Sequence, residues 1–280
     1  PMARGASRSS TVRDAVEQAR QIATEGHREI VLSGVNIGLF GSDNGESLLE
    51  LLRQLDRVDG VDRFRISSIE PNLLTDSIID FVAGSRRFMP HFHIPLQSGD
   101  DFVLGRMRRR YRASRYASRI ETIRKRIPDA GIGADVIVGF PAESRDRFEN
   151  SQRFVADLPV SYLHVFTYSE RKGTAAVDDI RGMGAHVVPK AERTRRNRVL
   201  RLLSDRKKTE FAKQNLGRLR PVLWEAKTVA GLTVGFTDNY IRVGTRSGSV
   251  TEGSIERVVL DRLDETGIVV SAPAEFVPIT

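Results

Sequence analysis

Cysteine is absent from the 280 residues of this chain. Without thiols, these residues can form neither disulfides nor the thiolate ligand sets of zinc sites and iron–sulfur clusters. The five histidines are scattered and give no zinc-binding spacing of the usual kind. His91 and His93 would share one face of a strand, and we interpret them as structural residues.

Long apolar runs are also missing. No stretch approaches the roughly 18–20 apolar residues that span a bilayer, and no apolar segment near Pro1 resembles a secretory signal. We therefore expect no membrane partner and a cytoplasmic location. The first residue is Pro1, which favours a piece of a longer protein, although Met2 leaves a natural start conceivable. Hydrophobic residues at 40% and charged residues at 29% are typical of a soluble globular protein.

Positive charge is concentrated in two blocks of the chain. Residues 190–220 contain twelve Lys or Arg and three acidic residues, and residues 105–126 contain ten and one. Each block carries a net charge of +9, whereas the whole chain carries only +8. This pattern is typical of a protein that binds a polyanion. Solvated helix faces would give the same pattern, but we favour a nucleic-acid partner.

The first two-thirds of the sequence alternates helical and strand-like segments. Apolar residues predict helices at 11–25, 47–58, 75–82, 113–126 and 144–158, and strands at 29–33, 63–69, 92–96, 134–138 and 162–167. Strands that alternate with helices predict a parallel sheet with right-handed crossovers. The pattern opens on a helix, so we expect that a preceding, sixth strand is missing. A partial six-stranded barrel and an open doubly wound sheet both fit.

The last third changes character. Residues 169–189 are loop-like, and a basic helix is predicted at 190–215. Residues 216–280 show short alternating runs broken by Gly and Asp-Asn turns. Five or so short strands in about 60 residues predict a small OB-like β-barrel. The predicted divisions are therefore 1–172, 173–215 and 216–280.

Every predicted strand of the α/β part ends in a polar or glycine-bearing turn. These turns lie at residues 33–36, 67–71, 95–100, 139–143 and 168–169. Functional groups of parallel barrels gather at the carboxyl ends of the strands. One such turn alone would be an ordinary helix cap, but five at equivalent positions favour a ligand site. No acid–base dyad, Ser-His-Asp set or Walker-type phosphate loop stands out.

Five separated segments carry a specific resemblance to one family. They read PMARGASRS at 1–9, HIPLQSGDD at 93–101, DVIVGFPAE at 135–143, FTYSERKGT at 166–174 and GFTDNYIRV at 235–243. In this order, over essentially the whole chain, they resemble the radical S-adenosylmethionine (SAM) tRNA methylthiotransferases. SGVN at 33–36 and SSIEP at 67–71 look most like the branch that acts on threonylcarbamoyladenosine. The isopentenyladenosine branch and the ribosomal-protein branch stay open.

The resemblance implies a fold, a reaction and partners. The fold would be α/β, with a partial radical-SAM (β/α)6-type barrel followed by a small all-β TRAM domain. The reaction would add a methylthio group to C2 of a hypermodified adenosine beside the anticodon, with S-adenosylmethionine and [4Fe–4S] clusters as cofactors. The partners would be the anticodon arm of tRNA and an electron donor, with no DNA expected.

The same resemblance implies cofactor-binding residues at the strand ends. Gly34 and Asn36 would face the methionine part of S-adenosylmethionine. Methionine or ribose would be bound by Ser68, Glu70 and Gln97. The adenine would be flanked by Ile137, Gly139, Phe140 and Pro141, and the pocket would be closed by Tyr168 and Ser169.

Charge and resemblance together predict the residues that contact RNA. They lie in the first basic block (Arg106, Arg109, Arg110, Arg112), in the basic helix (Arg195, Arg196) and in the β-domain (Lys227, Arg242, Arg246). We interpret Phe236 and Tyr240 as core residues rather than as platforms that stack on bases.

The chain departs from the family in what it lacks. The CxxxCxxC cysteines that would precede Pro1 are missing, together with an N-terminal domain and the first barrel strand. We therefore expect that this chain as given neither assembles the cluster nor turns over. Two alternatives remain, a non-catalytic RNA-binding module and a methylthiotransferase acting on a ribosomal-protein aspartate.

Overall fold

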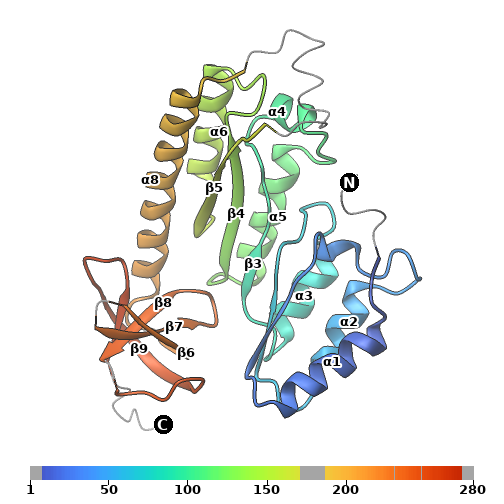
Figure 1. Cartoon of the computed structure of the whole chain (residues 1–280), viewed down its shortest axis with the longest axis vertical. Helices are drawn as coiled ribbons and strands as arrows, with labels where there is room; N and C mark the ends of the chain where they lie inside the picture. The colour runs from blue at the N-terminus through green and yellow to red at the C-terminus, as the bar shows by residue number, and fades with distance from the viewer. Residues whose placement is uncertain (1–7, 171–186, 230, 247, 273–280) are drawn as a thin grey trace.

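The computed structural model describes residues 8–170, 187–229, 231–246 and 248–272. Figure 1 shows two parts, a layer of strands flanked by helices and a small β-barrel. The long helix α8 (Lys190–Asn215) lies along β5 (Tyr162–Thr167) and leads into the β-barrel. Among the described helices, none is both long enough and apolar enough to cross a membrane.

The helices of the α/β part that precede α8 are α1 (Val12–Thr24), η1 (Ile37–Leu39), α2 (Leu48–Leu55), α3 (Asp76–Gly84), α4 (Asp101–Arg106), α5 (Ala113–Arg126) and α6 (Arg145–Asp157). Its other strands are β1 (Glu29–Leu32), β2 (Arg63–Ile66), β3 (His91–His93) and β4 (Gly131–Val138). The helices and strands predicted for this part are thus present, and most of them have shifted ends. Two short helices, η1 and α4, were not predicted. The loop expected at 169–189 lies mostly outside the described residues.

Local capping explains where several helices begin. Thr11, Ser47, Thr75 and Ser144 each accept a hydrogen bond from the backbone N–H three residues later. Such caps satisfy amide groups that the first helical turn leaves without partners. Asp100 does the same for α4, because its carboxylate accepts from two backbone N–H groups. A six-residue helix is too short to show apolar periodicity, so only this cap could have indicated it.

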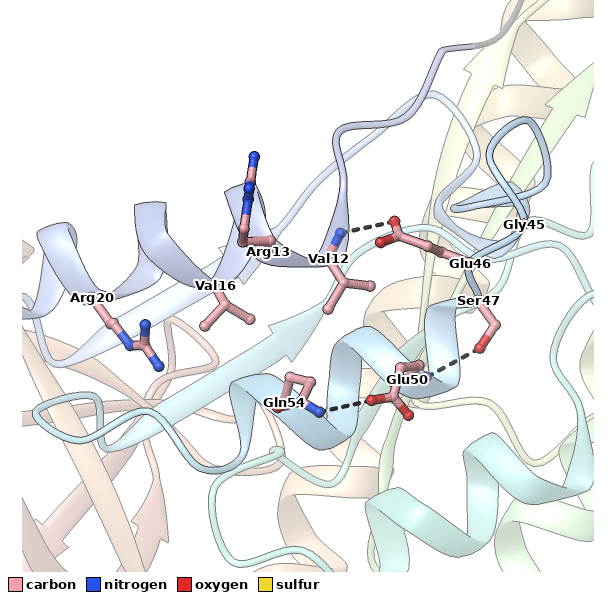
Figure 2. A pocket seen from close by; sticks show the side chains of 9 residues that line it. All are labelled: Val12, Arg13, Val16, Arg20, Gly45, Glu46, Ser47, Glu50 and Gln54. Atoms are coloured by element: carbon pink, nitrogen blue, oxygen red, sulfur yellow. Dashed lines mark hydrogen bonds between the residues drawn. The ribbon is translucent and has the colours of Figure 1, made fainter.

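The helices α1 and α2 pack against each other and leave a groove of about 610 Å³ on the surface (Figure 2). Its wall is closed at one end by the Val12 N–H, which donates to Glu46 at 2.8 Å. The Gln54 amide donates to Glu50 at 2.7 Å along the other helix. None of the residues predicted to bind cofactor or RNA lines this groove.

The five strands of the α/β part are parallel and lie side by side in chain order. β1 pairs with β2, and β3, β4 and β5 form a second ladder. Single bridges at Phe64–Phe88 and Ser68–His93 join the two ladders. A doubly wound sheet requires a reversal of strand order, which is absent from this sequential arrangement. The order therefore agrees with a partial barrel rather than with the open alternative.

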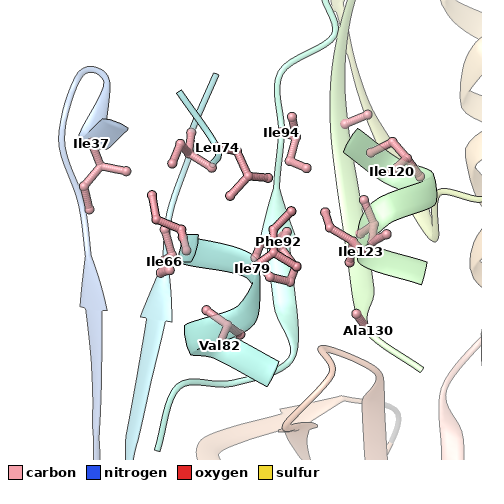
Figure 3. Packing of buried hydrophobic residues seen from close by; sticks show 14 of the residues in the cluster. Ile37, Ile66, Leu74, Ile79, Val82, Phe92, Ile94, Ile120, Ile123 and Ala130 are labelled. Carbon is pink, nitrogen blue, oxygen red and sulfur yellow. The ribbon is translucent and has the colours of Figure 1, made fainter. Parts of the chain in front are cut away.

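The two faces of these strands differ in chemistry. The first, which we call the apolar face, carries Phe64, Ile66, Phe92, Ile94 and Val136, each no more than 3% exposed. Figure 3 shows side chains of this face packed against those of α3 and α5. Because side chains alternate along a strand, the intervening residues lie on the opposite face. We call it the polar face, and it carries Arg63, Arg65, His91, His93, Asp135, Tyr162 and His164.

The β-domain is the small closed barrel that the sequence predicted, and its strand order is β10-β8-β7-β6-β9. Its strands are β6 (Leu219–Val229), β7 (Leu232–Thr237), β8 (Arg242–Arg246), β9 (Ile255–Leu263) and β10 (Val269–Ala272). The side chain of Trp224, 1% exposed, lies in its core with apolar residues from the other strands.

The β-domain contacts the polar face near the amino ends of the strands. Arg65 donates to the carbonyls of Thr237 and Asp238 at 2.7 and 2.8 Å. Tyr240 stacks on His91 with ring centroids 4.4 Å apart. At Gly131, a Cβ would lie 2.1 Å from the Asn239 carbonyl oxygen, so only glycine allows this approach.

Candidate functional site at the carboxyl ends of the strands

One group of predicted residues gathers beyond β1 and β2. Asn36 and Glu70 line a pocket of about 280 Å³ together with Arg109 and Arg110. Arg109 pairs with Glu70 at 3.3 Å, and both side chains are roughly a quarter exposed. The pocket thus unites residues that the sequence assigned separately to cofactor and to RNA. It presents guanidinium groups, one carboxylate and amide oxygens to a single ligand space.

A second group lies beyond β4 and β5. The rings of Phe140 and Tyr168 meet edge to face at 5.3 Å, and the Tyr168 N–H donates to the Val138 carbonyl at 2.9 Å. Arg193, from α8, lies over the Tyr168 ring at 5.5 Å and donates to its carbonyl at 3.1 Å. Gly139 has φ +76°, and any Cβ there would collide with the Arg193 side chain. Burial and the nearby Glu170 charge raise the pKa of Tyr168, so its phenol stays protonated at neutral pH.

A buried ion pair holds this second turn in place. Glu143 accepts from the Gly139 N–H at 2.6 Å and pairs with Arg196 at 2.7 Å. Both side chains are nearly inaccessible, at 2% and 5% exposure. Burial raises the pKa of Glu143, while the Gly139 and Arg196 donors act in the opposite direction. The pair ties α8 to the turn, which gives the turn one fixed conformation.

Gln97 lies between the two groups and is held by its backbone. It adopts φ +70°, donates to the Asp135 carbonyl at 2.8 Å and accepts from the Ile137 N–H at 2.9 Å. The phenol of Tyr111 donates to the carbonyls of Pro95 and Leu96 just before this turn. The Gln97 side chain is mostly buried. A non-glycine residue held in the left-handed region by its surroundings is typical of a functional site, so this turn is a candidate for ligand binding.

The remaining predicted cofactor residues occupy the same end of the sheet. Ser68 pairs through its backbone with His93, Ile137 is half-buried on β4, and Pro141 is buried in the turn after it. Gly34 and Ser169 are exposed. The described contacts bring Asn36 together with Glu70, and Phe140 with Tyr168. They do not join Gly34 or Ser169 to either group.

Several side-chain oxygens at this end fit a polar ligand such as S-adenosylmethionine. The side-chain oxygens of Asn36, Ser67, Asn72 and Tyr168 are buried and have no hydrogen-bond partner among the described residues. Buried polar atoms normally find partners, so an unsatisfied set at one strand end indicates ligand contacts. These residues would bind the amino-acid, ribose and adenine groups. An iron–sulfur cluster does not fit the residues present, because the chain contains no cysteine to supply thiolates.

The predicted RNA-binding residues lie at several places on the molecule. Arg110, Arg112, Arg195, Lys227 and Arg246 are exposed, and Arg106, Arg109 and Arg242 are half-buried. Arg195 pairs with Glu192 at 2.7 Å on the same helix. Arg196 is 4% exposed and its guanidinium is engaged by Glu143 and Glu192. It therefore has a structural position and is left out of the RNA surface.

The strand-end site and the β-domain lie at opposite ends of β4. The β-domain meets Gly131, where β4 begins, whereas Gly139 follows the last residue of β4. Eight residues of strand span roughly 25 Å at about 3.3 Å per residue. A ligand that contacts both would have to extend over at least that distance, which small molecules do not.

The sequence analysis missed two features, one at the strand-end site and one on the polar face. Arg193 was not singled out, since one arginine in a basic helix has no distinguishing signal. His93, Asp135 and His164 come from three adjacent strands, and their ligand atoms lie within 4.8 Å of one another. Burial alone would raise the pKa of Asp135, but hydrogen bonds from His164 and His93 lower it to about 2. Charged and imidazole side chains at alternate strand positions could have indicated this cluster.

Comparison with known proteins identifies relatives of the same kind as the resemblance. The chain is 37% identical over 273 residues to the threonylcarbamoyladenosine tRNA methylthiotransferase of Bacillus subtilis (strain 168), covering 95% of this chain and 59% of the relative. The protein of that name from Aquifex aeolicus (strain VF5) is 33% identical over 261 residues, covering 93% and 61%. The tRNA-2-methylthio-N(6)-dimethylallyladenosine synthase of Streptomyces viridosporus is 40% identical over 180 residues, covering 64% and 36%.

The chain thus spans about three-fifths of the length of the first two relatives. The family model described as the radical SAM superfamily matches residues 1–155. This match covers more than half of the chain and includes the first four parallel strands of the sheet. Together with the parallel strand order, it confirms the predicted fold class and the predicted cofactor, S-adenosylmethionine. The chain belongs to the radical SAM superfamily.

Proposed function

We propose that this chain is the radical SAM and RNA-binding portion of a tRNA methylthiotransferase. Its reaction would place a methylthio group on C2 of N6-threonylcarbamoyladenosine beside the anticodon, in the cytoplasm. The observation that carries the proposal is the similarity to threonylcarbamoyladenosine tRNA methylthiotransferases over 95% of the chain. S-adenosylmethionine supplies the adenosyl radical in this chemistry, and the residues of the strand-end site would bind and orient it.

A second substrate has its own support. The relative named for dimethylallyladenosine is the more identical one, at 40%, but the likeness covers only 64% of the chain. The match to the threonylcarbamoyladenosine enzyme covers 95% of the chain, and this greater extent favours threonylcarbamoyladenosine. Both substrates are adenosines of the anticodon arm, so the choice between them depends on the N6 substituent alone.

The arrangement of basic residues supports an extended RNA partner. Arg109 and Arg110 line the pocket beyond β1 and β2, whereas Lys227 and Arg246 belong to the β-domain at the other end of the strands. An anticodon arm is long enough to bridge roughly 25 Å, and its phosphates would pair with both sets. The modified base would enter the strand-end site while the stem rests on the β-domain.

The experiment compares binding of the 280-residue chain to one tRNA that carries threonylcarbamoyladenosine, dimethylallyladenosine or plain adenosine. We expect the first to bind most tightly, and binding to weaken steeply with salt as phosphate contacts release counterions. Lys227→Ala and Arg246→Ala should each lower the slope of log K against log salt by about 0.7–0.9. Arg13→Ala, whose side chain on α1 is 90% exposed, is the matched control. Affinity that stays flat with salt would contradict the proposal.

The cofactor is tested separately on the same chain. These residues lack cysteine, so we expect anaerobic reconstitution with iron and sulfide to give no iron–sulfur absorbance and no turnover. Near-stoichiometric iron with cluster absorbance would contradict this expectation. Salt-sensitive binding of tRNA without a preference for any modified base would instead support the alternative, a non-catalytic RNA-binding module. Methylthiolation of an aspartate-containing ribosomal peptide by the longer protein, and not of tRNA, would support the protein-modifying alternative.

A further inference from the structure

The polar face carries a compact group of metal-binding side chains apart from the strand-end site. His93 of β3, Asp135 of β4 and His164 of β5 each offer one ligand atom, all within 4.8 Å of one another. Asp135 Oδ1 lies 2.9 Å from His93 Nε2 and 3.4 Å from His164 Nδ1. We propose that these three residues bind one first-row divalent cation.

The spacing of the ligand atoms fits such an ion. Zinc bonds to imidazole nitrogen and carboxylate oxygen are about 2.0–2.2 Å long. Two ligands of one tetrahedral or octahedral ion are therefore roughly 3–3.5 Å apart. The distances from Asp135 Oδ1 to the two imidazole nitrogens, 2.9 and 3.4 Å, lie in or next to this range, so small rotations of the side chains would admit the ion.

The ligand types and their support favour the same class of ion. Two imidazoles and one carboxylate suit zinc, iron, cobalt and nickel, and this set leaves coordination positions open. The ligands stand on three adjacent hydrogen-bonded strands, where Asp135 is in register with His164. Rigid strands hold ligands more precisely than loops do. A site of this kind needs little rearrangement to close around the ion.

Access to the site is open on one side. The side chains of His93 and Asp135 are 14% and 19% exposed, while that of His164 is 52% exposed. His164 also lines a pocket of about 550 Å³ between β5, α8 and the β-domain, and Lys208 and Arg242 are on its wall. The wall also carries Asp205 and Glu265, so the pocket holds charges of both signs. Water that enters through this pocket would complete the coordination.

Because the chain has no cysteine, no thiolate competes for the metal in this test. Purified without a histidine tag, the chain is titrated with Co²⁺, followed by its visible ligand-field bands, and then with Zn²⁺ in competition. We expect one ion per chain and displacement of Co²⁺ by Zn²⁺. Asp135→Asn and His164→Gln should each weaken binding by at least about 100-fold, more than the loss of an outer-shell partner costs.

The control is a histidine outside the proposed site. His27 is exposed and lies 3.7 Å from Glu25, so His27→Gln measures adventitious surface binding and should leave the affinity unchanged. His164→Gln alters a half-exposed side chain and should keep the fold, which circular dichroism checks. Absence of saturable binding, or equal affinity in wild type and His164→Gln, would show that the three residues form only a hydrogen-bonded cluster.

Discussion

The two faces of one set of strands contrast sharply in this molecule. On the apolar face, Phe92 and Ile94 are fully buried beneath helices. On the polar face, His93 lies between these two residues in the chain and pairs with Asp135. Fully buried parallel strands usually read as continuous apolar runs. Strands that alternate instead show where a parallel sheet turns one face away from its helices and towards ligands or partners.

The largest effect is expected from a substitution that disrupts packing on the apolar face. Phe92→Ala should lower the free energy of unfolding by about 3–5 kcal/mol, because it leaves a cavity where α3 and α5 pack. Val31→Ala, on β1 but 54% exposed, should change it by no more than about 0.5 kcal/mol. Denaturant titration of both variants checks the pair. Similar losses for both would mean that the two faces are equally packed.

The next effect tests how the polar face holds the β-domain. Arg65→Met should lower the free energy of unfolding by about 2–4 kcal/mol. The substitution removes the guanidinium that donates to Glu29 and to the carbonyls of Thr237 and Asp238. Trp224 is the only tryptophan and lies in the β-domain core, so its fluorescence reports on that domain. We expect the fluorescence and circular dichroism transitions to coincide in wild type and to separate in the variant.

The control for this experiment is Arg13→Met. Arg13 is 90% exposed, and its guanidinium lies 3.4 Å from Asp14 on the same helix, α1. The fluorescence and circular dichroism transitions of Arg13→Met should coincide, as in wild type. Transitions that stay together in Arg65→Met as well would show that other contacts suffice to couple the two parts.

The smallest effect is a loss of stability at alkaline pH, which we expect from Tyr116 of α5 where it contacts the apolar face. Burial raises the pKa of Tyr116 well above its usual value of about 10, and its phenol donates to the Ile94 carbonyl at 2.9 Å. The unfolded chain therefore loses this proton first as pH rises. Stability present below about pH 10 should fall above it by roughly 1.4 kcal/mol per pH unit for this residue.

Tyr116→Phe isolates this contribution. The variant should be less stable at neutral pH, because the Ile94 carbonyl loses its donor. Its free energy of unfolding should then decline less steeply than that of wild type above about pH 10. Denaturant titrations at neutral and alkaline pH give both slopes. Parallel slopes for the two proteins would show that Tyr116 ionises normally in the folded state.

Much of the fold could be read locally. Thr11, Ser47, Thr75 and Ser144 are caps within the sequence itself, and each begins a predicted helix. The strand β5 and the helices α5 and α8 were predicted to the residue. The strand-end turns were also found, because every parallel strand must end at the same edge of the sheet.

The contacts between side chains that are distant in the sequence could not be predicted from it. The lack of cysteine, the two basic blocks and the family motifs were fixed by residue order alone. The burial of Arg196 against Glu143, the position of Arg193 over Tyr168, and the meeting of His93, Asp135 and His164 depend on residues separated by 25 to 71 positions. Such contacts form only when strands pair and α8 packs across them, because residue spacing determines which face a side chain takes but not which distant side chain it meets.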